Sequence, residues 1–432
     1  MTQIEIHNFG PIRDAKIDIK PMLVLIGPQA SGKSTVAKLI YFFETLPEEL
    51  FAEYAYNEES NISIDYLAEF IKKKFINFFG IQKNFDVKCT ICNLKWIRIS
   101  EANNQLTIEL HPQFLDYNND GAALKKLKST ILKMDSTDVE RQIILSQIKH
   151  KTMHLFGNKH DDNLYAVAGR SSTVSYSQTF SDLFKQSLYQ RMSMPISVET
   201  SDETLLYSFL KRVSLMKDIL NKFHDFESVF PYAEPTIKPL LELANDLIVQ
   251  VLHGKYTIDY DVERIVHSNG AVRLNVASSG QQEAIRILQD AFLGIYQGNN
   301  LFRIVEEPEA HLFPEAQKAT IELLTLALNN KNDNNLIITT HSPYTLTVIN
   351  NLIYAAKVGK DKPEKVKEIV PEALWLPTER VAAYFLKDGA AASIIDDELG
   401  EIDPKLIDLV SREINKKYGQ ITDIEYEEQE EE

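Results

Sequence analysis

The fold of this chain is decided by residues 27–35, Gly27-Pro28-Gln29-Ala30-Ser31-Gly32-Lys33-Ser34-Thr35. They match G-x-x-x-x-G-K-[ST], a loop whose backbone N–H groups cradle phosphates. The apolar run 22–26 before them predicts a buried strand, and residues 35–46 contain neither Gly nor Pro, which predicts a helix. The motif requires this order of strand, loop and helix. A chance glycine turn would explain the loop but not both flanks.

The residue types within the loop predict how a nucleotide is held. All nine residues are expected at the nucleotide, because the loop N–H groups and the helix N-terminus attract anions. Lys33 is expected to reach the β- and γ-phosphates, and the Ser34 hydroxyl to hold Mg²⁺.

A second apolar run, 301–305, ends in two carboxylates, Glu306 and Glu307. Acids at a strand end in a chain with a phosphate loop are typical of a Walker B arrangement. We expect Glu306 to hold Mg²⁺ and Glu307 to orient or deprotonate the attacking water. Without the phosphate loop, two solvated acids would be the better interpretation.

Two further segments narrow the class of protein. Ser279 and Gly280 lie in a polar turn before a predicted helix over 284–296, and such a turn is a second anion-binding site. The run 336–340 predicts another buried strand, and it leads directly to His341.

The order of phosphate loop, Ser-Gly-Gln turn, paired acids and strand-end histidine resembles the ABC class of ATPases, which includes the SMC and RecF-like heads. Residues 4–12, 306–314 and 340–343 look like the ATPases of the overcoming-lysogenisation-defect (OLD) group. Relatives of that group include ATPase subunits of bacterial anti-phage systems such as Septu and PARIS. The resemblance is specific over about 1–46 and 270–350.

The middle of the chain resembles the family only loosely. Residues 166–172 look like a family segment that carries Glu before Arg, and Gly169 stands at that place here. The resemblance therefore assigns no role to Arg170.

The resemblance implies an α/β fold, an ABC/SMC-like P-loop ATPase head with a mixed sheet, an antiparallel β meander and an inserted helical lobe. It implies ATP and Mg²⁺ as cofactors, held between two heads of a homodimer or higher homo-oligomer. One head would supply Lys33, Glu307 and the switch histidine His341, and the other Ser279 and Gly280. In similar heads, basic residues at about the position of Arg13 touch the nucleotide. Arg13 is therefore a candidate nucleotide contact, and an ordinary surface arginine is an equal alternative.

The head is expected to be split by the helical lobe, because three alternating runs over 84–111 predict the meander and helical patterns follow it. No long heptad array is present, so we expect no extended coiled coil. The expected parts are an N-terminal part of the head over 1–119, the inserted lobe over 120–254, a C-terminal part of the head over 255–360, and a C-terminal extension with an acidic tail over 361–432.

Composition and charge set limits on partners. Hydrophobic residues make up 44% of the chain and charged residues 25%, as in ordinary globular proteins. No apolar run approaches about 18 residues, so no membrane association is expected, and the N-terminus resembles no signal peptide. A cytoplasmic protein is expected. The net charge of −16 argues against a general nucleic-acid binder, but lysine runs at 72–74 and 125–128 leave direct DNA binding open.

The two cysteines, Cys89 and Cys92, have C-x-x-C spacing. A structural zinc site usually needs four ligands, and no second pair exists. Alternation of apolar and polar residues favours a half-buried strand with reduced thiols.

Three functions remain open from the sequence. The first is an ATPase that controls a separately encoded effector protein, such as a nuclease, in anti-phage defence. The second is a RecF-like DNA-repair ATPase, and the third a nucleotide-binding module with slow turnover. The acidic balance and the missing coiled coil favour the first. OLD nucleases carry a Toprim domain after the ATPase, and the chain after residue 343 lacks its acidic strand pattern, so any nuclease is expected on another chain.

Overall fold

A long mixed sheet is the frame of the molecule. The computed structural model describes residues 1–56, 62–91, 95–112, 114, 120–131, 139–175, 200–396, 398–403, 416 and 420–421. Eleven of the described strands form one sheet in the order β6-β5-β4-β1-β2-β14-β13-β3-β12-β11-β7. These strands are β1 (Gln3–Phe9), β2 (Ile12–Asp18), β3 (Met22–Ile26), β4 (Phe85–Thr90), β5 (Trp96–Ala102), β6 (Gln105–Leu110), β7 (Asp162–Ala166), β11 (Leu301–Glu306), β12 (Asn335–Thr340), β13 (Val381–Lys387) and β14 (Ala390–Ser393).

The sheet has a parallel half and an antiparallel half. Strands β13, β3, β12, β11 and β7 are parallel neighbours, whereas β2, β1, β4, β5 and β6 are antiparallel ones. The β13–β14 hairpin joins them, because β14 pairs with β13 on one side and with β2 on the other. The expected α/β head with a mixed sheet and a meander over 84–111 is confirmed.

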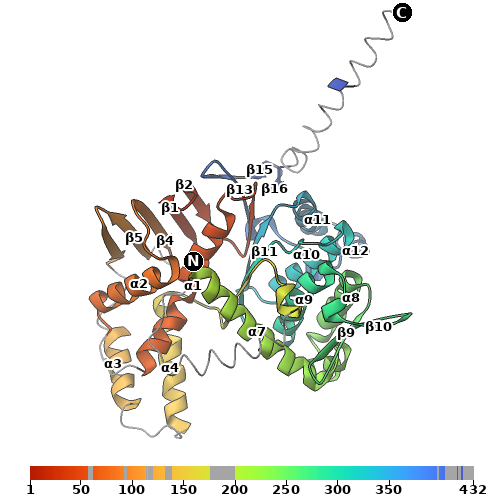
Figure 1. The fold of residues 1–432 in the computed structure, drawn as a ribbon, viewed down its shortest axis with the longest axis horizontal. Coiled ribbons are helices and arrows are strands. Elements are labelled where there is room, and N and C mark those ends of the chain that lie inside the picture. The colour runs from red at the N-terminus through yellow and green to blue at the C-terminus, as the bar shows by residue number, and fades with distance from the viewer. Residues whose placement is uncertain are drawn as a thin grey trace, which may run out of the picture.

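Helices cover both faces of the sheet (Figure 1), with α2 on β6 of the antiparallel half and α1 on β7, β11 and β12 of the parallel half. Successive strand residues point to opposite faces. Accordingly Met22 and Val24 join the core beneath α8–α11, and Leu23 and Leu25 the core beneath α1 and α2. The main helices are α1 (Lys33–Tyr56), α2 (Ile64–Phe79), α3 (Asp120–Ile131), α4 (Val139–Leu155), α5 (Ser172–Ser175), α7 (Ser201–Phe223), α8 (Lys238–Leu252), α9 (Ser279–Gln297), α10 (Pro314–Asn329), α11 (Pro343–Gly359) and α12 (Pro363–Lys367).

Short elements complete the fold. None of the helices in the described part of the chain has both the length and the apolarity to cross a membrane. A three-stranded sheet, β10-β9-β8, lies before α9. The remaining elements are β8 (Lys255–Asp259), β9 (Val262–His267), β10 (Gly270–Arg273), β15 (Ile395–Asp396), β16 (Glu401–Ile402) and the 3-10 turns Glu227–Tyr232, Leu274–Val276, Glu372–Leu374 and Thr378–Arg380.

Helix α1 is longer than the predicted 35–46, because it begins at Lys33 and continues through Pro47 to Tyr56. Its end is capped by Lys128, whose Nζ donates to the carbonyls of Tyr54 and Ala55. The Lys128 side chain is fully buried, and burial lowers its pKa. The lysine run at 125–128 is therefore not wholly a solvated face.

The sheet does not follow the expected division of the chain at residues 120, 255 and 361. Strand β7 lies within 120–254, and β13 and β14 lie within 361–432, yet all three belong to the main sheet. Helices α3 and α4 pack against each other and on α1, whereas α7 and α8 contact α9. Helical periodicity predicts the type of element but not the face of the sheet on which it packs. The helices expected to form one inserted lobe over 120–254 therefore pack in two separate places.

The strand predicted at Cys89 is confirmed, because Cys89 lies buried on β4 with a free thiol whose pKa burial raises to about 12. Cys92 lies outside the described residues. The described ranges contain no group of three or more His, Cys, Asp or Glu placed to hold a metal ion.

Candidate nucleotide-binding site

Three of the predicted motifs meet at one edge of the sheet. Ile26, before the phosphate loop, pairs in parallel register with Thr340, before His341. Glu306, at the end of β11, pairs with Thr339. Parallel strands bring their carboxyl ends to the same edge, where ligands of open α/β sheets bind. Motifs about 300 residues apart in the sequence are thus brought together.

Two glycines of the phosphate loop lie where a side chain would collide with neighbouring atoms. A Cβ on Gly27 would lie 2.1 Å from the Leu386 carbonyl oxygen, and one on Gly32 would lie 2.4 Å from Ile12 Cδ1. Ala30 adopts a left-handed conformation with φ of 59°. Leu386 belongs to β13, so the C-terminal hairpin forms one wall of the loop.

Lys33 lies at the centre of the site. Its Nζ donates to the carbonyls of Gly27 and Pro28, each at 2.9 Å, and lies 3.5 Å from His341 Nδ1. Burial lowers the pKa of Lys33, and the carboxylates that follow β11, Glu307 above all, oppose this shift. The Lys33 ammonium, which here donates to loop carbonyls, is the group that would bind a phosphate.

The loop fits a phosphate-bearing ligand. The Ser31 hydroxyl is buried without a hydrogen-bond partner in the part of the chain that the structure describes, so it is a free polar group at the loop. Ser34 lies exposed in the first turn of α1, where unpaired N–H groups favour an anion.

Glu307 and His341 form a pair that water can reach. Glu307 Oε1 lies 3.0 Å from His341 Nε2, and the two side chains are 39% and 36% exposed. Glu307 has a φ of 43°, a left-handed conformation that costs a non-glycine residue about 1–3 kcal/mol. Its N–H donates to the Thr339 carbonyl at 2.8 Å, which helps to fix this backbone.

Glu306 is held more tightly than its neighbour. Tyr165 Oη donates to Glu306 Oε1 at 2.7 Å, and the Ala168 N–H donates to Oε2 at 3.2 Å. Burial, reinforced by the Glu306 charge, raises the Tyr165 pKa well above its ordinary value, so the phenol remains a donor. Protein Mg²⁺ sites commonly combine one or two carboxylates with substrate phosphates. Glu306 and Ser34 fit such a partial ligand set.

Glu309 is a site residue that the sequence analysis missed. Its Oε1 accepts from Thr340 Oγ1 at 2.6 Å and from the His341 N–H at 2.8 Å. Its Oε2 is buried without a hydrogen-bond partner among the described residues. The carboxylate therefore fixes the backbone that carries His341, and the Glu-x-Glu spacing after β11 was the available signal.

Arg170, to which the resemblance assigns no role, is a second residue of the site. Its guanidinium is fully buried and donates to the carbonyls of Glu306 at 2.6 Å and Glu307 at 3.0 Å. It lies in the segment after β7, which has no periodic pattern, so only the tertiary structure shows this contact.

The turn at Ser279 and Gly280 begins helix α9. Ser278 caps the helix in a capping box with Gln281. Ser279 is exposed, whereas a Cβ on Gly280 would lie 2.5 Å from the His311 carbonyl oxygen. No hydrogen bond links Ser279 or Gly280 to the phosphate loop within the described ranges, so their role across an interface stays a prediction.

Arg13 is exposed beside the C-terminal hairpin. Its backbone N–H donates to the Gly389 carbonyl at 2.7 Å, and a Cβ on Gly389 would lie 2.8 Å from Arg13 Cγ. The position is near the phosphate loop, since Gly32 packs on the neighbouring Ile12. Nucleotide contact by Arg13 also stays a prediction.

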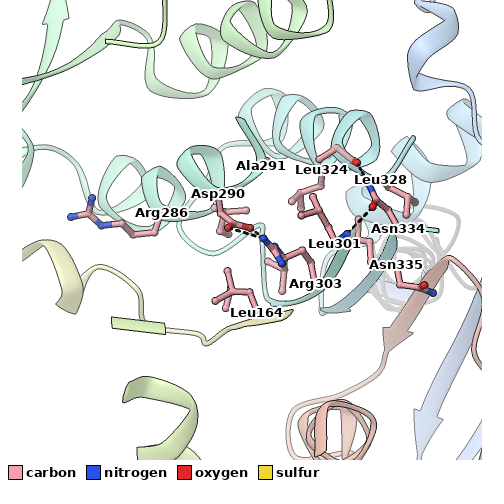
Figure 2. Close-up of a pocket in the computed structure, with 15 residues that line it drawn as sticks. Leu164, Arg286, Asp290, Ala291, Leu301, Arg303, Leu324, Leu328, Asn334 and Asn335 are labelled. Atoms are coloured by element: carbon pink, nitrogen blue, oxygen red, sulfur yellow. Dashed lines mark hydrogen bonds and ion pairs between the residues drawn. The ribbon is translucent and has the colours of Figure 1, made fainter. Parts of the chain in front are cut away.

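A cavity of about 20 Å³ lies on the sheet face opposite α1, between β11 and helices α9 and α10 (Figure 2). Arg303 Nε donates to Asp290 Oδ2 at 2.6 Å beside it. This volume has room for about one water molecule. The cavity is therefore not a nucleotide site.

A phosphate loop, paired acids and a strand-end histidine at the carboxyl edge of parallel strands define a P-loop ATPase head. The chain belongs to the AAA ATPase domain family, whose model matches residues 1–346. No curated protein matches the sequence. The β13–β14 hairpin lies beyond the matched residues, although it walls the phosphate loop.

Several solved structures are similar to this chain at low identity. The SMC head domain from Thermotoga maritima has a TM-score of 0.34 and 11% identity, covering 91% of this chain and 97% of that one. An SMC head bound to the C-winged helix domain of ScpA has 0.37 and 12%, covering 91% and 96%. The recombination mediator RecF has 0.33 and 11%, covering 91% and 97%.

Proposed function

We propose that this chain is an ATPase whose paired heads hold ATP and Mg²⁺ between them and control a separate effector protein. One observation carries the proposal. Lys33 Nζ lies 3.5 Å from His341 Nδ1, and His341 Nε2 lies 3.0 Å from Glu307 Oε1. Lys33, which would bind phosphate, His341 and the solvent-accessible carboxylate of Glu307 therefore lie in a row at the carboxyl edge of the sheet.

The residues divide the work of phosphoryl transfer. Lys33 and the loop N–H groups bind the phosphates and offset their charge. Glu307 orients water for attack on the γ-phosphorus and accepts a proton as the new P–O bond forms and the bond to ADP breaks. His341 holds the Glu307 carboxylate. Mg²⁺ at Glu306 and Ser34 would neutralise phosphate charge when bound.

The pairing of heads is supported by Ser279, which is exposed at the N-terminus of α9 and, among the described residues, makes no hydrogen bond to its own phosphate loop. In a two-fold dimer the interface is isologous, so whatever one chain contributes to its partner's site, the partner contributes in return. Each chain would then give Ser279 and Gly280 to its partner's nucleotide.

The test is to mix two inactive variants. Ser279→Arg places bulk and charge in the partner's site, and Lys33→Ala removes the phosphate ligand. In a two-fold dimer, half of the randomly mixed dimers have one intact site of two, so about a quarter of wild-type ATPase activity should return. Each variant mixed with itself is the control. A mixture no more active than its components would contradict the shared site.

The effector and the anti-phage role rest on the resemblance over residues 4–12 and 306–314. An ATPase cycle acts on another protein only if that protein binds the engaged and open states differently. Glu307→Gln, which should bind ATP tightly, and Lys33→Ala, which should bind it only weakly, are therefore expected to retain different amounts of the effector when tagged chains are isolated from the native host. Loss of that difference would contradict effector control.

Direct DNA binding is the alternative outcome. It is less favoured because Lys74 pairs with Glu49 at 3.0 Å and Lys72 with Glu69 at 3.8 Å, while Lys128 is buried. ATPase activity stimulated by DNA, with no protein retained, would replace the effector proposal by a RecF-like one.

A further inference from the structure

Arg170 makes an unusual set of contacts for a buried arginine. Its guanidinium donates to four carbonyls, and its backbone N–H donates to a carboxylate. The acceptors are the carbonyls of Val167 at 2.8 Å, Glu283 at 3.1 Å, Glu306 at 2.6 Å and Glu307 at 3.0 Å, and Glu283 Oε2 at 2.8 Å. A guanidinium has five donors in a fixed fork, so it can hold several acceptors in one arrangement.

Glu283 is the partner of Arg170 on helix α9. It is 2% exposed, and its Oε1 accepts from the Ser171 N–H at 3.1 Å. Its Oε2 lies 3.6 Å from Arg170 Nε. Glu283 follows Ser279 by about one helical turn, so this ion pair ties the N-terminal turn of α9 to the end of β11.

A second contact joins the same two places. Gly280 packs so closely on the His311 carbonyl that no larger residue would fit without movement. His311 ends a tight turn that begins at Glu307, in which the Ala310 N–H donates to the Glu307 carbonyl at 3.0 Å. The start of α9 therefore holds this turn at Glu307 through Arg170 and at His311 through Gly280.

The backbone at Glu307 needs such support, because its φ of 43° is unfavourable for a non-glycine residue. Arg170 binds the carbonyl on each side of that residue's N–Cα bond. A shift of α9 would therefore be transmitted to the backbone that carries the Glu307 carboxylate.

We propose that Arg170 and Glu283 are positioning residues, which set the Glu307 carboxylate according to the position of the Ser279 turn. This inference rests on the proposed function. A second head that docks on Ser279 would thereby act on the hydrolytic carboxylate of the chain it touches, besides completing that head's own site. Nucleotide binding would depend little on the pair, because neither residue contacts the phosphate loop in the described structure.

The chain offers a matched control on the same helix. Arg286 is also fully buried, and its Nη2 donates to Glu263 Oε2 at 2.8 Å. Its Nε donates to Thr173 Oγ1 at a long 3.4 Å, and among the described residues it makes no hydrogen bond to β11 or to the 307–312 turn. Breaking this pair should destabilise the fold as breaking the first one does.

The experiment compares Arg170→Lys and Glu283→Gln with Arg286→Lys and Glu263→Gln. For each we would measure the affinity for ATP, single-turnover hydrolysis, the Tm, and hydrogen exchange of the 307–312 amides. Arg170→Lys keeps the charge but loses the fork, and small misplacements of a reacting group can cost about 100-fold in rate. We expect its turnover to fall about 10- to 100-fold, with ATP affinity within about threefold and faster exchange at 307–312. The controls should lower the Tm but leave turnover per folded molecule within about twofold.

Equal turnover and equal 307–312 exchange in the two sets would overturn the inference while leaving the ATPase assignment intact. If Arg170→Lys does not fold, the test rests on Glu283→Gln, a nearly isosteric change, compared with its control Glu263→Gln in the same measurements. A wild type that binds ATP without any turnover would reject both the proposed function and this inference.

Discussion

The two halves of the sheet differ in what their strands bring together. In the parallel half, β3, β12 and β11 end at one edge and deliver Lys33, His341 and Glu307 to a common site. In the antiparallel half, neighbouring strand ends alternate between edges, and none of the predicted site residues apart from Arg13 lies there. Strand direction therefore decides which half of the sheet brings the candidate site residues together.

The cores beneath the two halves also differ. Beneath the meander, rings pack on one another, with Phe9 and Phe85 at 5.1 Å and Phe75 and Phe85 at 5.5 Å between centroids. Beside β11, on the opposite face, the core holds paired charges such as Arg303 and Asp290. Apolar burial stabilises without fixing one geometry, whereas buried ion pairs are costly to break and hold particular atoms in place.

The largest expected effect breaks the antiparallel half. Phe75→Ala leaves a cavity among Phe9, Phe79 and Phe85, so the free energy of unfolding should fall by about 3–5 kcal/mol. Denaturant unfolding measures this. ATP affinity at low temperature should stay within about twofold if the halves act independently, and a larger change would show that the meander shapes the site.

The next effect concerns the hydrolytic carboxylate. Glu307→Gln should lower turnover about 100-fold or more, because an amide cannot accept the proton of water. ATP binding should remain. Single-turnover hydrolysis and nucleotide titration measure the two, with Glu315→Gln, at an exposed position in the first turn of α10, as the control. Unchanged turnover in Glu307→Gln would remove the role assigned to that residue.

A smaller loss is expected at the phosphate ligand. Lys33→Ala removes charge-assisted hydrogen bonds to phosphate, so ATP affinity should fall by about 2 kcal/mol, or about 30-fold. Equilibrium binding of ATP measures this. Lys38→Ala, five residues further along α1, is the control, and equal affinities of the two variants would contradict the loop assignment.

The smallest effect concerns an ion pair beside the parallel half, and it is measured through pH. Burial alone would lower the pKa of His160, but the Glu44 carboxylate and hydrogen bonds to Glu44 and Asn335 outweigh it and raise the pKa. The imidazolium therefore stabilises the fold fully below the unfolded pKa of about 6.5, and this stability is lost as pH rises through the raised value. Tm should drop between pH 6 and pH 9, and drop less in Glu44→Gln. An identical drop in both would exclude this pair as a source.

The domain boundaries show where local patterns stop being informative. The residues from 361 on carry no motif, yet β13 pairs with the phosphate-loop strand and its Leu386 carbonyl lies against Gly27. An apolar run predicts a strand but does not say which strand it joins, because pairing partners are chosen by the whole core.

The sequence by itself determined the phosphate loop, the two acids at the end of β11 and the histidine after β12, because each is a local pattern in which chemistry and secondary structure coincide. It also determined the α/β class and the meander. Only the tertiary structure decided that Glu309 fixes the backbone of His341, and that Arg170 and Glu283 hold Glu307. Those contacts join segments far apart in the chain. Charged side chains such as Arg170 and Glu283 become buried and fixed in position only when the sheet has brought the ends of its strands together.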